Sequence, residues 1–598
     1  MAEPIIGNEP KNTKNSRPVR KNPLEGAITK FSQMKFRTAL IILGVLTALI
    51  IFWQIYFGLI SFSVYNVGLR ALIIILLLLW SIPLVYFYMR NRKTEVKKLA
   101  AFNKVHWGWK IPAGIALVMI VVCICLAIFT TPMFLAKQYN KMISVDVKSG
   151  TADEPLQEFV EEVDDFNGTD EDIKVAIIDK YFASLLCEKV LGETSGGYAS
   201  QYEINDYTLI HYQDSLYWVG ALEPKGFFQW TSSAKSGGSP GYVLVDATQT
   251  TTNATAKLVT THKLKYTPGA YLWNDAERQM YFSNMGALRE SEIGFEIDEQ
   301  GVPYYTKVIY RKKFGITSGD EATGIIVMNA TTGECKTYSY EDKVPEWIDN
   351  VQSHDMILKQ LNYWGEYSKG YFNTWFAKKE VNNTTDGYNY VYNQGKFYIT
   401  TGITAKSNDN AIIGMVLSDL RTKQTTMYNM AGATEQAAMK SAQGIQEVAA
   451  AGYYANFPTL INFSGVPTFY MALKDKAGNI KMYAFVNVEK YATVLAAGKT
   501  PLEAKQKYED ELKKSDIIDK PTTPTGEEKS GTIKFIDRFV QNGNTMFLVT
   551  INDGEADIDY TISINTTGAE KLLKANVNDT IKFKINKNKV TEIVSINA

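Results

Sequence analysis

Three long apolar runs near the N-terminus constrain the fold of this chain more than any other feature of its sequence. They are "ALIILGVLTALIIFWQIYFGLISF" (39–62), "ALIIILLLLWSIPLVYFYM" (71–89) and "IPAGIALVMIVVCICLAIFTTPMFLA" (111–136). None contains a charged residue, and each is long enough to cross a bilayer as a helix. One such run is also compatible with a buried helix of a soluble protein, but three in close succession favour a membrane. We therefore predict a transmembrane region of three helices over 37–136.

Basic residues are distributed unevenly around these runs. Residues 1–37 contain eight Lys or Arg, and Arg90–Lys110 contains seven, whereas the loop between the first two runs has only Arg70. Lys and Arg gather on the cytoplasmic side of membrane proteins. We therefore predict a multi-pass plasma-membrane protein whose basic N-terminal arm (1–36) is cytoplasmic and whose part after residue 136 is extracytoplasmic. The polar start of the chain, with no small-residue cleavage site after the first run, argues against a signal peptide.

The net charge of zero conceals two regions of opposite charge. Residues 1–136 carry a formal charge of +12 and the remainder carries −12. Binding to phosphate backbones requires a basic surface. The acidic composition of the large outward part therefore makes nucleic acid an unlikely partner, and the expected partners are the lipid bilayer and either an envelope protein or further copies of this chain.

Residues 137–200 are predicted as a helical connector. The stretch 167–193 has the composition of a helix capped by Thr169 or Asp170. Several acids precede or begin this stretch: Asp164, Asp165, Asp170, Glu171 and Asp172. The ligand order of a calcium-binding EF-hand loop is absent. Capping and a solvated face explain these acids better than a calcium site does.

A hairpin pattern recurs through residues 201–513. An apolar strand and an Asn/Asp turn occur in "GYVLVDATQT" (241–250), "TGIIVMNATTGECKTY" (323–338) and "GMVLSDLRTKQTTMY" (414–428). The recurring turn positions are Asp246, Asn329, Asp419 and Asn487. Helices are predicted between the strand groups, over 342–367, 433–452 and 500–514, the last capped by Thr500. The fold class predicted is α+β, with repeated modules of an antiparallel sheet and a helix.

The pieces "GVPYY…GIIVMNATTGECKTY" and "GVPTFYMALKDKAGNIKMYAF" resemble PepSY-type domains. The resemblance covers 273–345 and 433–513. It implies small extracytoplasmic α+β modules found beside membrane anchors and in protease propeptides, whose members inhibit, chaperone or bind. This family offers no catalytic residues to transfer.

A second kind of domain is predicted at the C-terminus. Residues 514–529 form a charged linker rich in Pro and Thr, and 530–598 contain three strands, a short helix and two strands. This order predicts a five-stranded OB-like barrel. The helix is expected over Gly568–Ala575, capped by Thr567, with Leu572 and Leu573 closing the barrel. The candidate aromatic residues of a ligand-binding face are Phe535, Phe539, Phe547 and Tyr560, although core packing explains most of them.

Motifs for catalysis or metal binding are weak. "GGSPG" (237–241) matches the G-x-S-x-G pattern, but a strand rather than a helix follows Ser239, so a loop is expected. A phosphate loop ending at Gly498–Thr500 would need glycine where Thr493 stands. The outward histidines, His211, His262 and His354, are far apart in sequence and have no zinc-binding spacing. We predict no catalytic, cofactor-binding or metal-binding residue and no cofactor, and we expect the chain not to be an enzyme.

Four cysteines are present. Cys123 and Cys125 lie in the third apolar run, where they serve as small apolar residues. Cys187 and Cys335 are the outward pair, and free buried thiols are favoured over a disulfide, although spacing alone does not decide between them.

These observations favour a membrane-anchored extracytoplasmic interaction or scaffold protein of the cell envelope, binding partners or itself through β-rich modules. The alternative is an accessory subunit of an envelope enzyme or transport complex.

Overall fold

The structure is a computed structural model of the chain. It describes residues 36–92, 110–148, 173–518 and 527–597, with short gaps at 175, 177, 195–196, 214, 250–253, 394, 407, 464, 542–543, 553, 555, 565 and 587–588. The chain forms two compact units, Met1–Ala504 and Lys505–Ala598. Both contain antiparallel sheets, and the first also contains most of the helices, so the fold is of the mixed α+β class as predicted.

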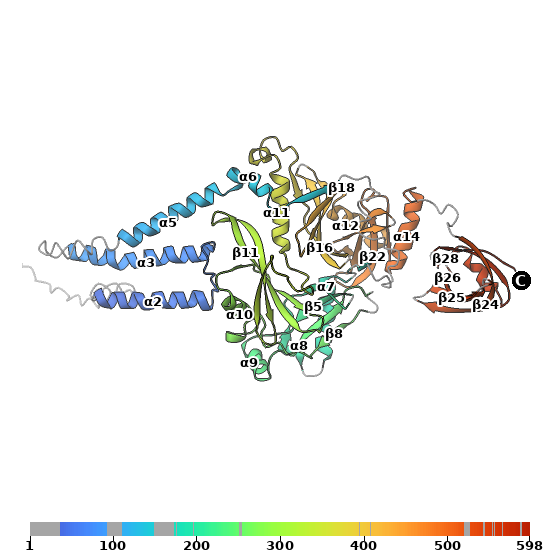
Figure 1. The fold of residues 1–598 in the computed structure, drawn as a ribbon, viewed down its shortest axis with the longest axis horizontal. Coiled ribbons are helices and arrows are strands. Elements are labelled where there is room, and N and C mark those ends of the chain that lie inside the picture. Colours follow the sequence, from blue (N-terminus) through green and yellow to red (C-terminus); the bar gives the residue numbers. More distant parts are fainter. Residues whose placement is uncertain are drawn as a thin grey trace, which may run out of the picture. The chain divides into compact units, whose positions relative to one another are not determined.

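The described residues of the N-terminal region, 36–92 and 110–129, form three apolar helices. They are α2 (Phe36–Tyr56), α3 (Val67–Arg92) and α5 (Lys110–Phe129), which lie side by side and extend away from the sheets of the first unit (Figure 1). Thr38–Tyr56 and Lys110–Phe129 are long and apolar enough to cross a membrane, whereas the corresponding apolar part of α3, Val67–Ile82, is shorter. The cytoplasmic arm predicted over 1–36 lies almost entirely outside the described residues.

Two polar joints attach these helices to the sheets. At the first joint, α10 (Ala276–Ser283) supplies Arg278, whose Nε donates to the Tyr56 carbonyl at 2.9 Å, and Tyr281, whose hydroxyl donates to the Ile60 carbonyl at 3.0 Å. At the second, α6 (Pro132–Asn140) follows α5 directly, and its Asn140 donates to the Trp364 carbonyl at 2.6 Å. The folded body is thus hydrogen-bonded to the end of α2 and to α6, the helix that follows α5.

Four antiparallel sheets follow one another along the first unit, and each contains a meander of four strands. The first meander comprises β4 (Thr208–Tyr212), β5 (Ser215–Ala221), β7 (Tyr242–Asp246) and β8 (Ala256–Val259). The second comprises β10 (Gly294–Ile297), β11 (Pro303–Phe314), β12 (Ser318–Asn329) and β13 (Cys335–Ser339). The third comprises β15 (Asn389–Asn393), β16 (Lys396–Ala405), β17 (Asn408–Asp419) and β18 (Thr425–Ala433). The fourth comprises β20 (Thr459–Phe463), β21 (Val466–Lys474), β22 (Ile480–Asn487) and β23 (Leu495–Gly498).

The repeated turn predicted from the sequence is the same in all four sheets. Asp246, Asn329, Asp419 and Asn487 each end the third strand of their meander. Each side-chain oxygen accepts a hydrogen bond from a backbone N–H two or three residues later, at distances of 2.9, 2.9, 2.7 and 2.6 Å respectively. Short polar side chains stabilise such Asx turns because they replace a backbone acceptor. The sequence repeat therefore marks the turn between the third and fourth strands of each sheet.

First strands of neighbouring meanders approach one another. Strand β10 contacts β4 and β5, and β15 contacts β20. Residues of β4, β15 and β20 and the segment leading into β10 line two adjoining cavities. The sheets carrying β5, β11, β16 and β22 are labelled in Figure 1.

Short strands extend the sheets at their edges. Strand β1 (Val145–Lys148), which follows α6, pairs in parallel with β18, and β2 (Ile173–Lys174) pairs with β15. Three further short strands, β9 (Leu288–Arg289), β14 (Asn382–Thr384) and β19 (Tyr454–Ala455), pair with β11, β16 and β21. Strands β3 (Tyr202–Glu203) and β6 (Glu223–Pro224) instead pair with each other in a separate two-stranded sheet. Residues 137–200, predicted as a helical connector, therefore also contribute strands to the third sheet.

Helices separate the sheets, but several differ from their predicted bounds. Helix α7 (Lys180–Glu193) is capped by Asp179, whose carboxylate accepts from the Phe182 N–H at 2.9 Å. The prediction that this helix spans 167–193 is wrong at its start, because β2 occupies part of that range. The predicted caps Thr169 and Asp170, like the other acids of that cluster, lie outside the described residues. A further short helix, α8 (Tyr198–Gln201), precedes β3.

The helix predicted over 342–367 also begins later than expected. Helix α11 (His354–Glu366) starts after its cap Ser353, because Ile348 and Val351 are used to cover Ile325 and Val327 of β12. The predicted helix over 433–452 is divided into α12 (Glu435–Gln443) and α13 (Gln446–Ala451). The prediction for 500–514 is confirmed: α14 (Pro501–Lys514) begins where the Thr500 hydroxyl accepts from the Glu503 N–H at 3.1 Å.

The second unit contains five antiparallel strands in the order β26-β25-β24-β27-β28. They are β24 (Glu527–Gln541), β25 (Asn544–Asn552), β26 (Asp557–Ser563), β27 (Thr580–Asn586) and β28 (Lys589–Asn597). A 3-10 helix, η3 (Ala569–Lys574), lies between β26 and β27. Strand β24 begins at Glu527, which pairs with Ile585, so the last residues of the predicted linker 514–529 belong to this sheet.

Three details of this unit differ from expectation. The residue that precedes η3 as its cap is Gly568, in a left-handed conformation, and not Thr567. Leu572 is buried as predicted, but Leu573 is exposed because a 3-10 turn directs neighbouring side chains to different sides. Of the four candidate face aromatics, Phe547 and Tyr560 belong to the buried core, whereas Phe535 and Phe539 are exposed.

Candidate functional site: an acidic cavity between the sheets

The first of the two cavities has a volume of about 210 Å³ and is enclosed by three of the four sheets. Strand β4 contributes Thr208 and Leu209, the segment before β10 contributes Glu290 and Glu292, and β15 contributes Tyr390. The residues that precede and begin α11, from Asn350 to His354, complete the wall. The cavity is therefore built where the first strands of successive sheets converge.

The second cavity, of about 260 Å³, adjoins the first and extends toward the fourth sheet. The two share Lys180, Leu209, Trp218, Tyr388 and Tyr390. Its far side is lined by Phe457, which precedes β20, and by Thr459, the first residue of β20. Together the cavities form a hollow with aromatic walls and a polar, largely acidic group at one side.

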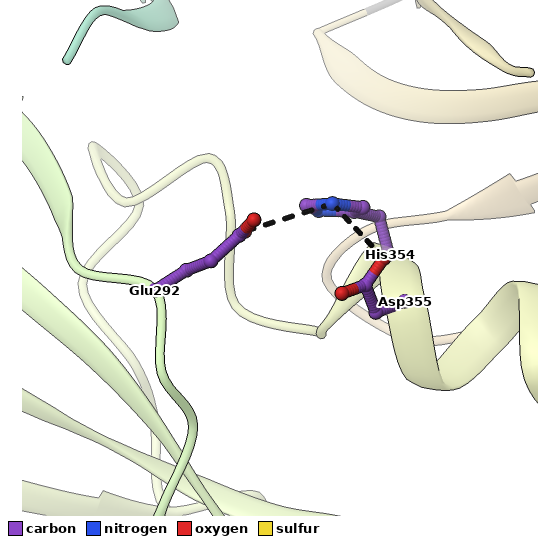
Figure 2. Close-up of side chains that lie close together, drawn as sticks. All are labelled: Glu292, His354 and Asp355. Atoms are coloured by element: carbon purple, nitrogen blue, oxygen red, sulfur yellow. Dashed lines mark ion pairs between the residues drawn. The ribbon is translucent and has the colours of Figure 1, made fainter.

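The acidic group consists of Glu292, His354 and Asp355 (Figure 2). His354 is the first residue of α11 and Asp355 the second, while Glu292 approaches from the segment before β10. The His354 Nε2 lies 3.6 Å from a Glu292 carboxylate oxygen and 3.5 Å from one of Asp355. One ligand atom from each residue lies within 4.8 Å of the other two. The two carboxylates thus flank one imidazole nitrogen from different chain segments.

The imidazole is held by its aromatic neighbours. Its side chain is only 17% exposed, compared with 59% for Glu292 and 66% for Asp355. The ring of Tyr388 lies 4.9 Å from the imidazole, and the Tyr390 hydroxyl lies 3.5 Å from Nδ1. With Nδ1 facing Tyr390, the Nε2 is the atom that faces the carboxylates. The arrangement therefore presents a packed imidazole nitrogen between two largely exposed acids.

Ser353 connects this group to the beginning of α11. Its hydroxyl accepts from the Met356 N–H at 3.1 Å as the helix cap and donates to the carboxylate of Glu290. Burial raises the pKa of the Glu290 carboxyl, and the hydrogen bond from Ser353 partly opposes this shift. The cap thereby sets the position of both His354 and an additional acid of the cavity wall.

Charges around the first cavity are predominantly negative. Asp206, Glu290 and Glu292 line it, with Asp355 adjacent, and the cationic residue in the wall, Lys180, is ion-paired to Asp206. Burial also raises the pKa values of the Tyr388 and Tyr390 hydroxyls, which keeps both phenols neutral hydrogen-bonding groups. A cavity of this kind attracts cationic groups, since aromatic faces and carboxylates both favour positive charge.

A second carboxyl pair, Glu296 and Asp349, lies near the cavity but is enclosed. The Glu296 carboxylate accepts from the Asp349 N–H at 2.8 Å, and the Asp349 carboxylate accepts from the His211 N–H at 2.7 Å. Burial raises the pKa of Glu296 to about 7 and that of Asp349 well above its usual value, with Glu296 adding to the latter shift. The two carboxylates bond the second sheet to neighbouring segments, and Glu296 is completely buried and so not accessible to a ligand.

The cavity group is capable of holding a metal ion. One imidazole nitrogen and two carboxylate oxygens form a ligand set that suits Zn²⁺ or Mn²⁺. The hydroxyl of Tyr390 stands at the other ring nitrogen, where hydrogen-bonding partners of metal-binding histidines are found. Glu292 and Asp355 have room to move toward an ion because both are largely exposed.

The structure separates the three histidines considered in the sequence. His354 enters the cavity group, His211 stacks on Tyr392 with ring centroids 4.5 Å apart, and His262 lies in the loop after β8. Sequence spacing did not identify the partners of His354. Glu292 lies 62 residues earlier in the chain, and only the packing of α11 against the second sheet brings it close. The one local signal of this site in the sequence was the His354–Asp355 pair at the start of a predicted helix segment.

The other sequence motifs are not assembled into sites. Ser239 is buried in a loop, where its backbone pairs with Leu264, and β7 follows it, so no nucleophile elbow is formed. Gly498 ends β23, and Thr500 caps α14. Cys187 and Cys335 are free, which confirms the expectation of unpaired thiols, as are Cys123 and Cys125.

Comparisons with known proteins give little further information. No family model matches the chain, and no curated protein matches it. The resemblance to PepSY-type domains therefore stays a prediction. Among solved structures, similar chains include a GH32 beta-fructofuranosidase from Bombyx mori, with 10% identity over 70% of each chain and a TM-score of 0.19. An alpha-L-arabinofuranosidase from Lactobacillus brevis shares 9% identity over 67% of this chain and 97% of its own, with a TM-score of 0.16. A levansucrase mutant from B. megaterium shares 9% identity over 72% of this chain and 93% of its own, with a TM-score of 0.18.

These neighbours correct one expectation from the sequence. The chain was predicted not to be an enzyme, and all three similar structures are named as enzymes, so that prediction is contradicted and is withdrawn. The TM-scores of 0.16 to 0.19 carry no argument about a substrate or a reaction of this chain.

Proposed function

We propose that this protein is a membrane-anchored extracytoplasmic interaction protein of the cell envelope, and that its acidic cavity binds a basic side chain of an envelope protein partner. The observation that carries this proposal is the convergence of Glu292, His354 and Asp355 on a tyrosine-lined cavity. Lysine and arginine side chains combine a charge that suits the carboxylates with an alkyl stem that suits the aromatic walls.

The anchor in this proposal consists of three spans, α2, α3 and α5, with the N-terminus in the cytoplasm. Large apolar side chains along these helices point outward, including Ile41, Trp53 and Val118. Such surfaces require lipid or protein to cover them. The concentration of Lys and Arg before α2 and between α3 and α5 supports this orientation. The body then lies outside the cell.

Two finer features of the architecture belong to the same proposal. Residues 273–345 and 433–513 are proposed to be related to PepSY-type modules, which fits a binding role. The second unit is proposed to close into an OB-like barrel. Its strand order and the position of η3 between the third and fourth strands support that closure.

A divalent cation is a second candidate ligand for the same group. The favouring observation is that three potential ligand atoms lie within 4.8 Å of one another and come from an imidazole and two carboxylates. Such an ion would be held by His354 Nε2 and one oxygen each of Glu292 and Asp355.

The proposal is tested by purifying the full-length protein from membranes in mild detergent and identifying its bound partners. The double variant Glu292→Gln/Asp355→Asn removes two charges while retaining similar side-chain volumes. Glu299→Gln, at an exposed turn of the same sheet, is the matched control. We expect a partner that accompanies the wild type and the control but is lost from the double variant. Equal recovery of all partners by the three proteins would contradict a binding role for the cavity.

A further inference from the structure

Two groups of exposed aromatic side chains lie beside the ends of the apolar helices. The first aromatic patch comprises residues of α9 (Phe227–Lys235) and of η1 (Leu272–Asn274) with the residue before it: Phe227, Phe228, Tyr271, Leu272 and Trp273. Phe228 is 81% exposed and Trp273 is 66% exposed. Large aromatic residues in such numbers on a surface mark a binding face, because water does not compensate their exposure.

The first aromatic patch is continuous with α2. The Trp273 ring lies 5.4 Å from that of Tyr56, the last residue of α2, and exposed Phe57 follows immediately. Within the patch, Phe227 packs on Tyr271 at 5.5 Å. The adjacent joint, where Arg278 donates to the Tyr56 carbonyl, fixes this part of the body to the helix end. The apolar surface of α2 thus passes into the surface of the folded body.

The second aromatic patch lies at the end of α5. It comprises Phe372, in η2 (Tyr371–Thr374), together with Trp375 and Phe376, the last of which is 83% exposed. Helix η2 contacts α6, which follows α5 directly. There, exposed Phe129 and Phe134 lie 5.2 Å apart. Lys378 and Lys379 follow the patch in sequence, so aromatic and basic residues stand together.

We infer that both aromatic patches insert into the interfacial layer of the outer leaflet. The body would then rest on the membrane at two places beside its spans. Trp, Tyr and Phe with neighbouring Lys are typical of the membrane–water interface, where an aromatic ring meets acyl chains and a charged group meets lipid headgroups. Lipid is favoured over a protein partner as the occupant because each patch continues the apolar surface of a helix end. Both ends belong to the same boundary, since α2 leads outward, α3 leads back and α5 leads outward again. This inference rests on the proposed membrane anchorage.

The test places a nitroxide spin label at single positions of the full-length protein in phosphatidylcholine–phosphatidylglycerol vesicles. Native cysteines are first replaced, and labelled cysteine is then introduced by Phe228→Cys, Phe376→Cys, Val118→Cys or Lys343→Cys. Position 118 is an exposed site on α5, and position 343 is a strongly exposed site of the body. Accessibility to oxygen, which partitions into lipid, is compared with accessibility to a water-soluble nickel chelate.

We expect oxygen accessibility to exceed nickel accessibility at positions 118, 228 and 376, and the reverse at 343. Lipid contact at 118 together with water contact at 228 and 376 would overturn the inference and leave the anchorage intact. Water contact at 118 would overturn the anchorage itself. Protection of 228 and 376 from both reagents would show that protein or a second copy covers the patches, which would also overturn the inference.

Discussion

Two acidic groups are formed by the same two chain segments, and they have opposite properties. The segment around β10 supplies Glu292 and Glu296, and the segment leading into α11 supplies Asp349, His354 and Asp355. Glu296 is fully buried, whereas Glu292 and Asp355 are largely exposed. Within each segment, an acid that stabilises the fold, Glu296 or Asp349, therefore lies only a few residues from an acid of the cavity group, Glu292 or Asp355.

The difference teaches how this fold distinguishes stability from binding. Burial raises the pKa values of Glu296 and Asp349 because it disfavours their charged forms, and the backbone N–H groups that donate to them partly oppose this rise. In the cavity group, Glu292 and Asp355 are largely exposed to water, and aromatic packing holds the third member, His354. Exposed carboxylates change the free energy of folding little, and they remain available to bind a cation. The following predictions test this distinction, beginning with the largest effect.

The largest expected effect is on the pH dependence of stability. Burial raises the folded-state pKa of Glu296 from 4.5 to about 7, so between these values the folded protein retains a proton that the unfolded chain has released. The free energy of unfolding should therefore fall as pH rises through this window, by about 3 kcal/mol at most. Glu296→Gln, which cannot ionise, should flatten the dependence, and Glu292→Gln should not. Urea unfolding in detergent at pH 5 and pH 8 measures this. Parallel pH profiles of wild type and Glu296→Gln would show that Glu296 is ionised in the fold.

The next effect concerns the loss of one carboxyl from each group. Asp349→Ala removes the carboxylate that accepts the hydrogen bond of the His211 backbone N–H. Because a lost hydrogen bond away from solvent is costly, this change should lower the free energy of unfolding by about 2 kcal/mol. Asp355→Ala, the matched exposed change, should alter it by less than about 0.5 kcal/mol. Urea unfolding at neutral pH compares the two. Equal effects would mean that the buried and exposed groups are not distinct.

A smaller effect is expected on metal binding. If the exposed group takes Zn²⁺, His354→Gln should weaken binding at least about tenfold, because the imidazole supplies the least mobile ligand. Glu296→Gln should leave the affinity unchanged, since Glu296 is enclosed. Calorimetric titration of the full-length protein with ZnCl₂ provides the measurement. If Glu296→Gln lost as much Zn²⁺ affinity as His354→Gln, the buried pair and the cavity group would have to belong to one metal site.

The smallest expected effect is that of Ser353, which lies between Asp349 and His354 in the chain. Ser353→Ala removes the cap of α11 and the partner of Glu290, and should lower the free energy of unfolding by about 1 kcal/mol. Ser353→Thr, which retains the hydroxyl, is the control. A normal stability in Ser353→Ala would show that α11 does not depend on this cap, and that His354 is positioned by its aromatic neighbours alone.

The sequence predicted the elements of the fold better than their assembly. Asp246, Asn329, Asp419 and Asn487 were identifiable because an Asx turn is a local feature, formed within a few residues. The beginning of α11 was placed too early, because Ile348 and Val351 have a helical spacing but pack against β12 instead. Tertiary contacts decided this boundary, and local periodicity could not reveal them.

The candidate site was largely beyond local prediction for the same reason. His354 was considered and set aside, since its partner Glu292 lies 62 residues earlier in the chain, in the segment before β10. The packing of α11 against the second sheet brings the two together, and no short motif encodes that packing. The apolar helices were predictable because membrane-length hydrophobicity is a property of a continuous segment.

The most direct test of a basic-group binding site is calorimetric titration of the full-length protein in detergent with a tetralysine peptide. Wild type and Glu299→Gln should bind the peptide with equal affinity, and added salt should weaken both, because the interaction is between exposed charges. Glu292→Gln/Asp355→Asn should lose at least about tenfold in affinity, equivalent to about 1.4 kcal/mol. Undiminished binding by the double variant, or no binding by the wild type, would contradict the assignment of this cavity as the binding site.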